Sequence, residues 1–166
     1  MRKKVRLSRW WGVAATVVLF AGGIWALIRN PFSSPDDALA AFYSEDPGME
    51  CMTAAPLHQA GKAVAPLVIS ELPNRAMPRR RYAIGFLGEK GYREALPILE
   101  KIARDSTELD YIRGDALIAI SQIDIDFARK VASQLADLTK HLDDIVQAVS
   151  RGGSTLSRFS DRSCEW

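Results

Sequence analysis

The chain has 166 residues, the length of one domain, and its 48% hydrophobic and 25% charged residues argue against a disordered protein. All 20 acidic residues follow position 35, whereas six of the 22 basic residues precede residue 30. From residue 30 onward the chain therefore carries 16 basic and 20 acidic residues, which argues against a general nucleic-acid binder.

The first predicted element is a membrane-spanning helix at residues 10–28. This run, WWGVAATVVLFAGGIWALI, contains no charged side chain, and as a helix it is about 28 Å long, close to the thickness of a bilayer's hydrocarbon core. The basic leader, residues 1–9, belongs in the cytoplasm by the positive-inside rule, and Trp10, Trp11 and Trp25 suit the interfaces. We predict a single-pass protein of the bacterial inner membrane whose remaining residues lie in the periplasm.

The same segment leaves a cleaved signal peptide as an alternative. Ala21, Gly22 and Gly23 supply the small residues that a signal peptidase needs before its cut, although IWALI would then become an exposed apolar terminus. Because the apolar run is longer than the usual signal-peptide core of about 7–15 residues, we expect an uncleaved signal anchor. Both alternatives export the rest of the chain.

The chain has two cysteines, Cys51 and Cys164, and both lie in the predicted exported part. In an oxidising compartment a disulfide between them would hold the polar C-terminal tail, residues 152–166, near the start of the folded domain. Two unrelated thiols remain the alternative, because a disulfide depends on geometry that the sequence does not give.

Residues 29–51 are predicted to form a linker and one capping helix. The linker NPFSSPDD is rich in proline and serine, and Ser34 or Asp36 can cap a helix at residues 35–43 whose first turn is acidic. Residues 52–151 then consist of helical patterns separated by short turns, with no alternating run that would indicate a strand.

A helix-turn-helix unit recurs about three times when the chain is compared with itself. At an offset of 33 residues a basic, a small and an apolar position recur. The paired positions are Arg80 with Arg113, Ala83 with Ala116, and Leu87 with Ile120. A weaker first copy aligns Gly61 with Gly91. We expect the first helices of the three units to end near Gly61, near Gly88 and Gly91, and near Asp124. Gly88 and Gly91 are both expected to end their helix with backbone angles that other residues resist. A last capping helix is expected at 138–153.

The segment RRRYAIGFLGEKGYREALPILEKIARD, residues 79–105, resembles a HEAT-type repeat in the variant also found in phycobilin-lyase proteins, and IRGDALIAISQI, residues 112–123, repeats its first half. The resemblance implies an all-α fold: a short right-handed α-solenoid of about three HEAT-like repeats over residues 52–151, preceded here by the single transmembrane helix. It also implies that Asp105 and Arg113 are structural residues that bond across the turns between repeats.

Residues with catalytic chemistry are few. His58 and His141, the two histidines of the chain, have no cysteine or carboxylate at metal-ligand spacing. The sequence contains neither a phosphate-binding loop nor a G-x-S-x-G motif. We therefore predict no catalytic residue, no metal, no cofactor and no enzymatic activity.

The predicted partner surface lies on the second helix of each repeat, which lines the concave side of a solenoid. The residues expected to bind a partner protein are Glu94, Glu100, Lys101, Arg104, Lys130, Gln134 and Asp137. The basic run Arg79–Arg81 leaves two interpretations open. It is either the first turn of a helix with Arg80 as a structural residue, or a basic patch for an acidic partner or anionic lipid headgroups.

Two classes of function follow. The first is a membrane-tethered interaction module that binds an envelope or periplasmic protein as a scaffold, an inhibitor or an assembly factor; immunity against a toxin delivered to the periplasm would be a subtype. The alternative, suggested only by the repeat variant, is a pigment-attachment lyase-like protein or its chaperone subunit. Export argues against this alternative, because such proteins act in the cytoplasm.

Overall fold

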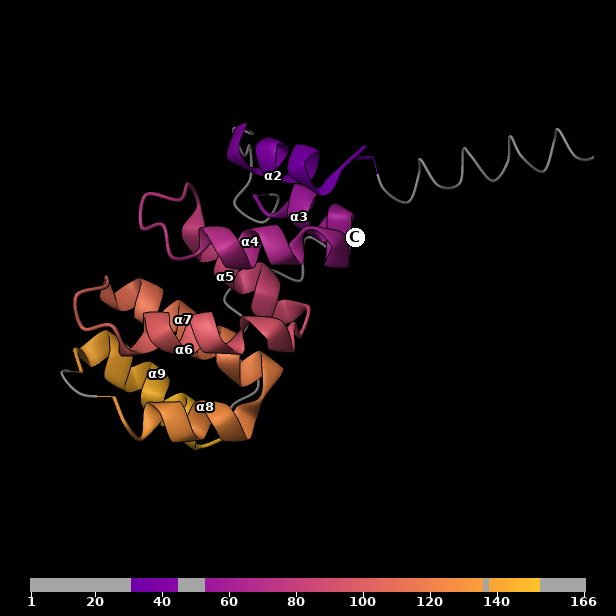
Figure 1. Ribbon diagram of the computed structural model, residues 1–166. Helices are drawn as coiled ribbons and strands as arrows, with labels where there is room; N and C mark the ends of the chain where they lie inside the picture. Colours follow the sequence, from indigo (N-terminus) through magenta and orange to yellow (C-terminus); the bar gives the residue numbers. More distant parts are fainter. Residues whose placement is uncertain (1–30, 45–52, 136–137, 153–166) are drawn as a thin grey trace, which may run out of the picture. The chain divides into compact units, whose positions relative to one another are not determined.

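The computed structural model describes residues 31–44, 53–135 and 138–152, and the regular secondary structure of these residues is entirely helical (Figure 1). They form eight α-helices and two short 3-10 helices and contain no strand, which confirms the all-α prediction. The elements are α2 (Pro35–Ser44), α3 (Ala55–Ala60), η2 (Gly61–Ala63), α4 (Ala65–Glu71), α5 (Arg80–Glu89), η3 (Arg93–Ala95), α6 (Leu96–Arg104), α7 (Asp110–Ile123), α8 (Ile125–Ala132) and α9 (Lys140–Ser150).

Most helix boundaries have a local cause that is visible in the sequence. Gly61 and Gly91 have positive φ angles of 62° and 67°, which residues with a Cβ atom rarely adopt. Gly61 follows the last residue of α3, and Gly91 lies in the turn after α5. The Asp124 carboxylate accepts a hydrogen bond from the amide of Phe127 and caps α8. The predicted cap at Ser34 is also present, since its Oγ accepts from the amide of Asp37 at 3.1 Å.

The helix α5 ends at Glu89, near Gly88 and Gly91 as predicted, but Gly88 does not have the predicted positive φ angle. Gly88 is the last residue but one of α5, and it is buried against α7. A Cβ placed on Gly88 would lie 2.7 Å from Cα of Ala119 in α7. The missing side chain therefore allows α5 and α7 to approach closely, and the turn itself depends on Gly91.

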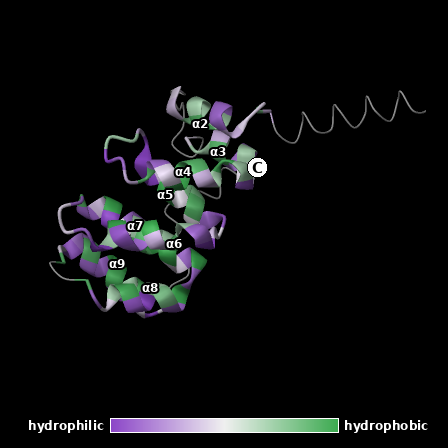
Figure 2. Ribbon diagram, in the orientation of Figure 1, coloured by the Kyte–Doolittle hydropathy of each residue, from purple (hydrophilic) through white to green (hydrophobic). Residues whose placement is uncertain are grey.

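The core of the domain is built around α7, which packs against α5, α6, α8 and α9. Ten of its 14 residues are buried, and Leu117, Ile118 and Ile120 are fully inaccessible to solvent. Of the helices around it, α6, α8 and α9 are amphipathic, and Figure 2 shows both hydrophobic and hydrophilic residues along α8 and α9. A helix buried on nearly all sides holds its neighbours in fixed positions, so the outward faces of α6 and α8 are carried on a rigid support.

Two arginines that are 33 residues apart make the same kind of bond. Arg80 and Arg113 lie near the starts of α5 and α7, and both are buried. Each donates its Nε–H to a main-chain carbonyl at the end of the preceding helix, Leu72 O at 2.8 Å and Ala103 O at 3.2 Å. The offset found in the sequence thus corresponds to a repeated interaction that closes a helix-to-helix turn.

A group of charged side chains joins the turn before α5 to the turn before α7. The Arg80 Nη1 lies 2.5 Å from Oε2 of Glu108, and both side chains are less than a tenth exposed. Arg75 donates to the Asp105 carboxylate at 2.6 Å and to the Thr107 hydroxyl at 2.6 Å. Asp105 therefore bonds to Arg75 across neighbouring turns and to Thr107 within its own turn. Arg113 pairs with Asp110 of its own helix.

Several predictions concern residues outside the described ranges. These are the leader 1–9, the membrane helix 10–28, Cys51, Cys164 and the tail from 153 onward. Within the described ranges no helix has the length and apolar character needed to span a bilayer. The described helices belong to one compact unit that begins at Ser34.

Candidate functional site

Side-chain bonds connect α6 to the residues that follow α8, and three of the predicted partner-binding residues make them. The Arg104 Nε donates to Oε1 of Glu100 at 2.9 Å, one turn earlier on α6. The other end of the same guanidinium donates to Oε1 of Gln134. Because Arg104 binds both neighbours, these three side chains are ordered on one surface.

Lys101 and Lys130 stand beside this bonded group, on α6 and α8 respectively, and both are exposed. The ammonium group of neither lysine forms an ion pair or hydrogen bond with any residue of the described ranges. We call Glu100, Lys101, Arg104, Lys130 and Gln134 the α6–α8 surface. Of the two remaining predicted residues, Asp137 lies outside the described ranges and Glu94 lies at a different place, described next.

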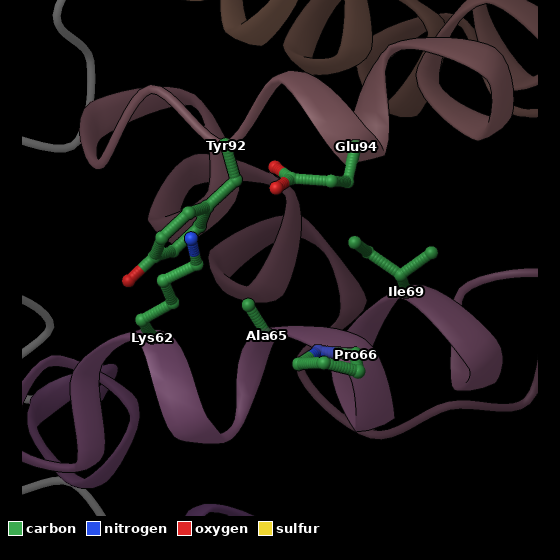
Figure 3. Close-up of a pocket in the computed structure, with 6 residues that line it drawn as sticks. All are labelled: Lys62, Ala65, Pro66, Ile69, Tyr92 and Glu94. Carbon is green, nitrogen blue, oxygen red and sulfur yellow. The ribbon is translucent and has the colours of Figure 1, made fainter.

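Glu94 lines a small pocket between α4 and the segment that leads into α6 (Figure 3). The pocket has a cavity volume of about 70 Å³ and is partly open to solvent. Its lining residues are Lys62, Ala65, Pro66, Ile69, Tyr92 and Glu94. Figure 3 shows side chains of α4 on one side and the Tyr92 ring and the Glu94 carboxylate on the other. We call this the α4–η3 pocket.

The walls of the α4–η3 pocket are apolar, and its two charges have opposite signs. Lys62 and Glu94 are exposed, and neither makes an ion pair with the other or with any described residue. The pKa of Tyr92 is raised, first by burial and second by the negative charge of Glu94. The phenol therefore stays neutral at physiological pH and adds a polar but uncharged edge to the pocket.

The sequence indicated Glu94 but missed the rest of this pocket, whose residues come from segments about 30 positions apart. One local signal was present. Ala65, Val68 and Leu72 form the buried stripe of α4, so Pro66 and Ile69 fall outside it. A second pair of apolar residues, three positions apart on the outward face of an amphipathic helix, is a recognisable sign of a contact surface.

The two histidines are not brought together, since His58 lies on α3 and His141 on α9. His58 Nε2 is 3.5 Å from Oε2 of Glu89, and its ring meets Phe86 edge-on at 5.3 Å between centroids. Burial, and then the charge of Lys90, lower the pKa of His58 to about 4, while burial raises the pKa of Glu89. At pH 7 the imidazole is therefore neutral, and the contact with Glu89 is not an ion pair.

This environment predicts a pH-dependent stability. The pKa of His58 is about 4 in the folded protein and 6.5 as its ordinary value, so the unfolded chain binds the proton more readily between these values. The free energy of unfolding should be highest above pH 6.5 and fall as the pH is lowered toward 4, by about 2 kcal/mol at pH 5.

Urea unfolding of wild type and of His58→Gln at pH 7.5 and pH 5.0 measures this effect. The variant should lose less stability than wild type between the two pH values. Equal losses in both proteins would contradict the assignment. Glu89 has the opposite effect on stability, because a carboxyl pKa raised by folding favours the folded state at low pH. The same unfolding measurements on Glu89→Gln give the contribution of Glu89 to the pH dependence.

All three arginines of the run at 79–81 form bonds with other residues of the domain. Arg79, at φ 55°, donates to the carbonyl of Phe42 at 2.7 Å. Arg80 pairs with Glu108, and Arg81 Nε lies 3.3 Å from the carboxylate of Asp115, which is fully buried. Since each guanidinium has a partner within the domain, the structure favours the structural interpretation over the basic patch.

Among the described residues no group of three or more histidine, cysteine, aspartate and glutamate side chains is arranged to hold a metal ion. Comparison with protein-family models, with curated proteins and with solved structures gives no match for this chain. The HEAT-like repeat thus stays a prediction from the sequence. The candidate functional features of the described domain are the α6–α8 surface and the α4–η3 pocket.

Proposed function

We propose that this chain is a membrane-anchored HEAT-like repeat protein that binds another protein of the bacterial envelope and acts as a scaffold, an inhibitor or an assembly factor. The observation that carries the proposal is the α6–α8 surface. Arg104 holds Glu100 and Gln134 in place through its two hydrogen bonds, and the ammonium groups of two nearby lysines have no partner within the described domain. A surface whose side chains are already ordered loses little conformational entropy on binding.

The packing of the helices supports a short solenoid as the architecture. In chain order α3 packs against α5, α5 against α7, and α7 against α9, while α6 contacts α8. Such a succession is expected when helix pairs α3/α4, α5/α6 and α7/α8 stack in two layers, with α2 and α9 as caps. The equivalent bonds of Arg80 and Arg113 agree with this repeat unit.

The cellular location belongs to the same proposal. Residues 10–28 anchor the chain in the inner membrane with the leader in the cytoplasm, and the helical domain lies in the periplasm. A disulfide between Cys51 and Cys164 holds the tail to the start of the domain. The protein acts by binding and performs no chemical reaction.

The α4–η3 pocket gives no specific support to the lyase alternative. Pockets that enclose small-molecule ligands usually have volumes of about 300–1,000 Å³. The α4–η3 pocket has a cavity volume of about 70 Å³ and is partly open, so it lies far below this range. It is a better match for one side chain of a protein partner than for a tetrapyrrole-sized pigment.

Photocrosslinking in native membranes tests the proposal. A photoreactive residue is placed at Lys101, at Lys130 and, as the matched control, at Ala40, which is exposed on α2. We expect the same envelope protein to be captured from positions 101 and 130, with at least a tenfold lower yield from position 40. Equal yields from all three positions, or capture of lipid alone, would remove the α6–α8 surface as the binding site.

A further inference from the structure

The α4–η3 pocket combines three properties that together describe the occupant it would accept. The first is its apolar wall, formed by Ala65, Pro66 and Ile69 of α4 and by the ring of Tyr92. Apolar side chains that enter such recesses contribute strongly to protein binding, because their surface is fully removed from water. The cavity volume of about 70 Å³ has room for one small apolar side chain and not for a larger ligand.

The second property is the pair of charges that lines the pocket. Lys62 and Glu94 come from opposite sides of it, and neither is neutralised by a described residue. Their charges sum to zero, so the pocket has no net attraction for anionic lipid headgroups or for nucleic acid. Opposite charges on the two sides instead favour an occupant that carries the complementary pair, and they fix the direction in which it lies.

The third property is position. Glu94 belongs to η3, and η3 runs directly into α6, which carries Glu100, Lys101 and Arg104. A partner bound on the α6–α8 surface therefore lies next to the pocket. One segment of that partner can fill the pocket while the rest of the partner covers α6.

We propose that the α4–η3 pocket binds an extended segment of the partner protein, in which one apolar residue enters the pocket between an acidic residue that faces Lys62 and a basic residue that faces Glu94. This inference rests on the proposed function and specifies the chemistry of the partner. The apolar residue supplies most of the affinity, and the two charges supply the orientation and exclude segments with the reverse order.

A peptide selection tests this inference with the full-length protein in lipid nanodiscs. The probe is a phage-displayed library of random 12-residue peptides. We expect enriched peptides to contain an apolar residue with an acidic residue on one side and a basic residue on the other. A synthetic peptide with the enriched motif should bind Lys62→Glu at least tenfold more weakly than wild type in fluorescence anisotropy. Exchanging the acidic residue of the peptide for lysine should restore binding to that variant.

Two further variants make the test specific to the pocket. Ile69→Asp places a charge in the apolar wall and should lower peptide affinity at least tenfold. Lys90→Glu is the matched control, because Lys90 is an exposed lysine near the same turn that does not line the pocket, and it should change affinity less than twofold. Circular dichroism of each variant confirms that the helical domain is intact.

The inference is overturned if no peptide is enriched, if the motif lacks the charge pair, or if Lys62→Glu and Lys90→Glu behave alike. A motif that matches residues 158–161 of this chain, RFSD, would assign the pocket to an internal segment in place of a partner. Capture of a partner from position 101 together with any of these results would leave the proposed function standing and remove only the inference. If no partner is captured from position 101 and no peptide with the charge pair is enriched, both the proposed function and the inference are removed.

Discussion

Replacing Glu108 with alanine is expected to lower the free energy of unfolding by about 4 kcal/mol. The reason is the burial of its partner, because the Arg80 side chain is only 7% exposed and its Nη1 lies 2.5 Å from the carboxylate. Without Glu108 the guanidinium keeps its bond to the carbonyl of Leu72 but remains a buried, uncompensated charge. The turns before α5 and α7 would lose their closest ionic link.

Urea unfolding of a fragment that begins at Ser34 measures this loss, since the described helices belong to the unit that starts there. Glu100→Ala is the matched control: it removes a partially exposed pair with Arg104 on one helix and should cost about 0.5 kcal/mol or less. A loss at Glu108 no larger than the loss at Glu100 would show that the buried pair does not hold the two turns. The double change Arg80→Met with Glu108→Leu should recover part of the stability, because no buried charge is left.

Gly88→Ala is expected to destabilise the domain by about 3 kcal/mol. The new Cβ would lie 2.7 Å from Cα and 2.8 Å from Cβ of Ala119, and it would also contact Oε1 of Gln122. The Ala119 atoms are part of or attached to the backbone of α7, so they cannot move aside without displacing the helix. Because α7 packs against four other helices, the displacement would spread through the core.

Gly114→Ala is a control at a site with a similar distance but a different neighbour. There the added Cβ would meet Cδ1 of Ile145 at 2.5 Å, the far end of a flexible side chain that can adopt another rotamer. The change should alter stability by less than about 1 kcal/mol, because alanine also favours the helix by about 1 kcal/mol over glycine. Thermal unfolding followed by circular dichroism compares the two variants. Equal destabilisation would contradict the distinction between a backbone neighbour and a side-chain neighbour.

Several local features of the fold were determined by the sequence itself. The helix predicted at residues 35–43 forms at Pro35–Ser44, and the one predicted at 138–153 forms at Lys140–Ser150. Proline in a first turn, glycine with positive φ and side-chain caps act within a few residues of the position they occupy, so they can be recognised without a structure. The offset that pairs Arg80 with Arg113 also proved meaningful, because repeated local sequence led to repeated local bonding.

The prediction that the backbone angle of Gly88 ends the helix was wrong, because glycine is used for two different physical reasons. A glycine is used where the backbone needs a positive φ angle and also where two helices approach closely, and the sequence around α5 offers both explanations. Only the position of Ala119, 31 residues later and on another helix, separates them. The partners of Arg79, Arg80 and Arg81 are equally distant along the chain, so a run that suggested a basic patch became part of the framework.

The candidate site also contains features that the sequence predicted and features that depend on tertiary structure. Charged residues on α6 and α8 were predictable, because helical periodicity alone places them on the outward faces of amphipathic helices. The α4–η3 pocket and the neutral state of His58 were decided by tertiary structure. Lys62 and Glu94 line one pocket only after α4 and η3 have packed, and His58 meets Glu89 only after α3 has packed against α5. The sequence determined which faces are polar, whereas packing decided which polar groups are buried, which are paired and which stay available to a partner.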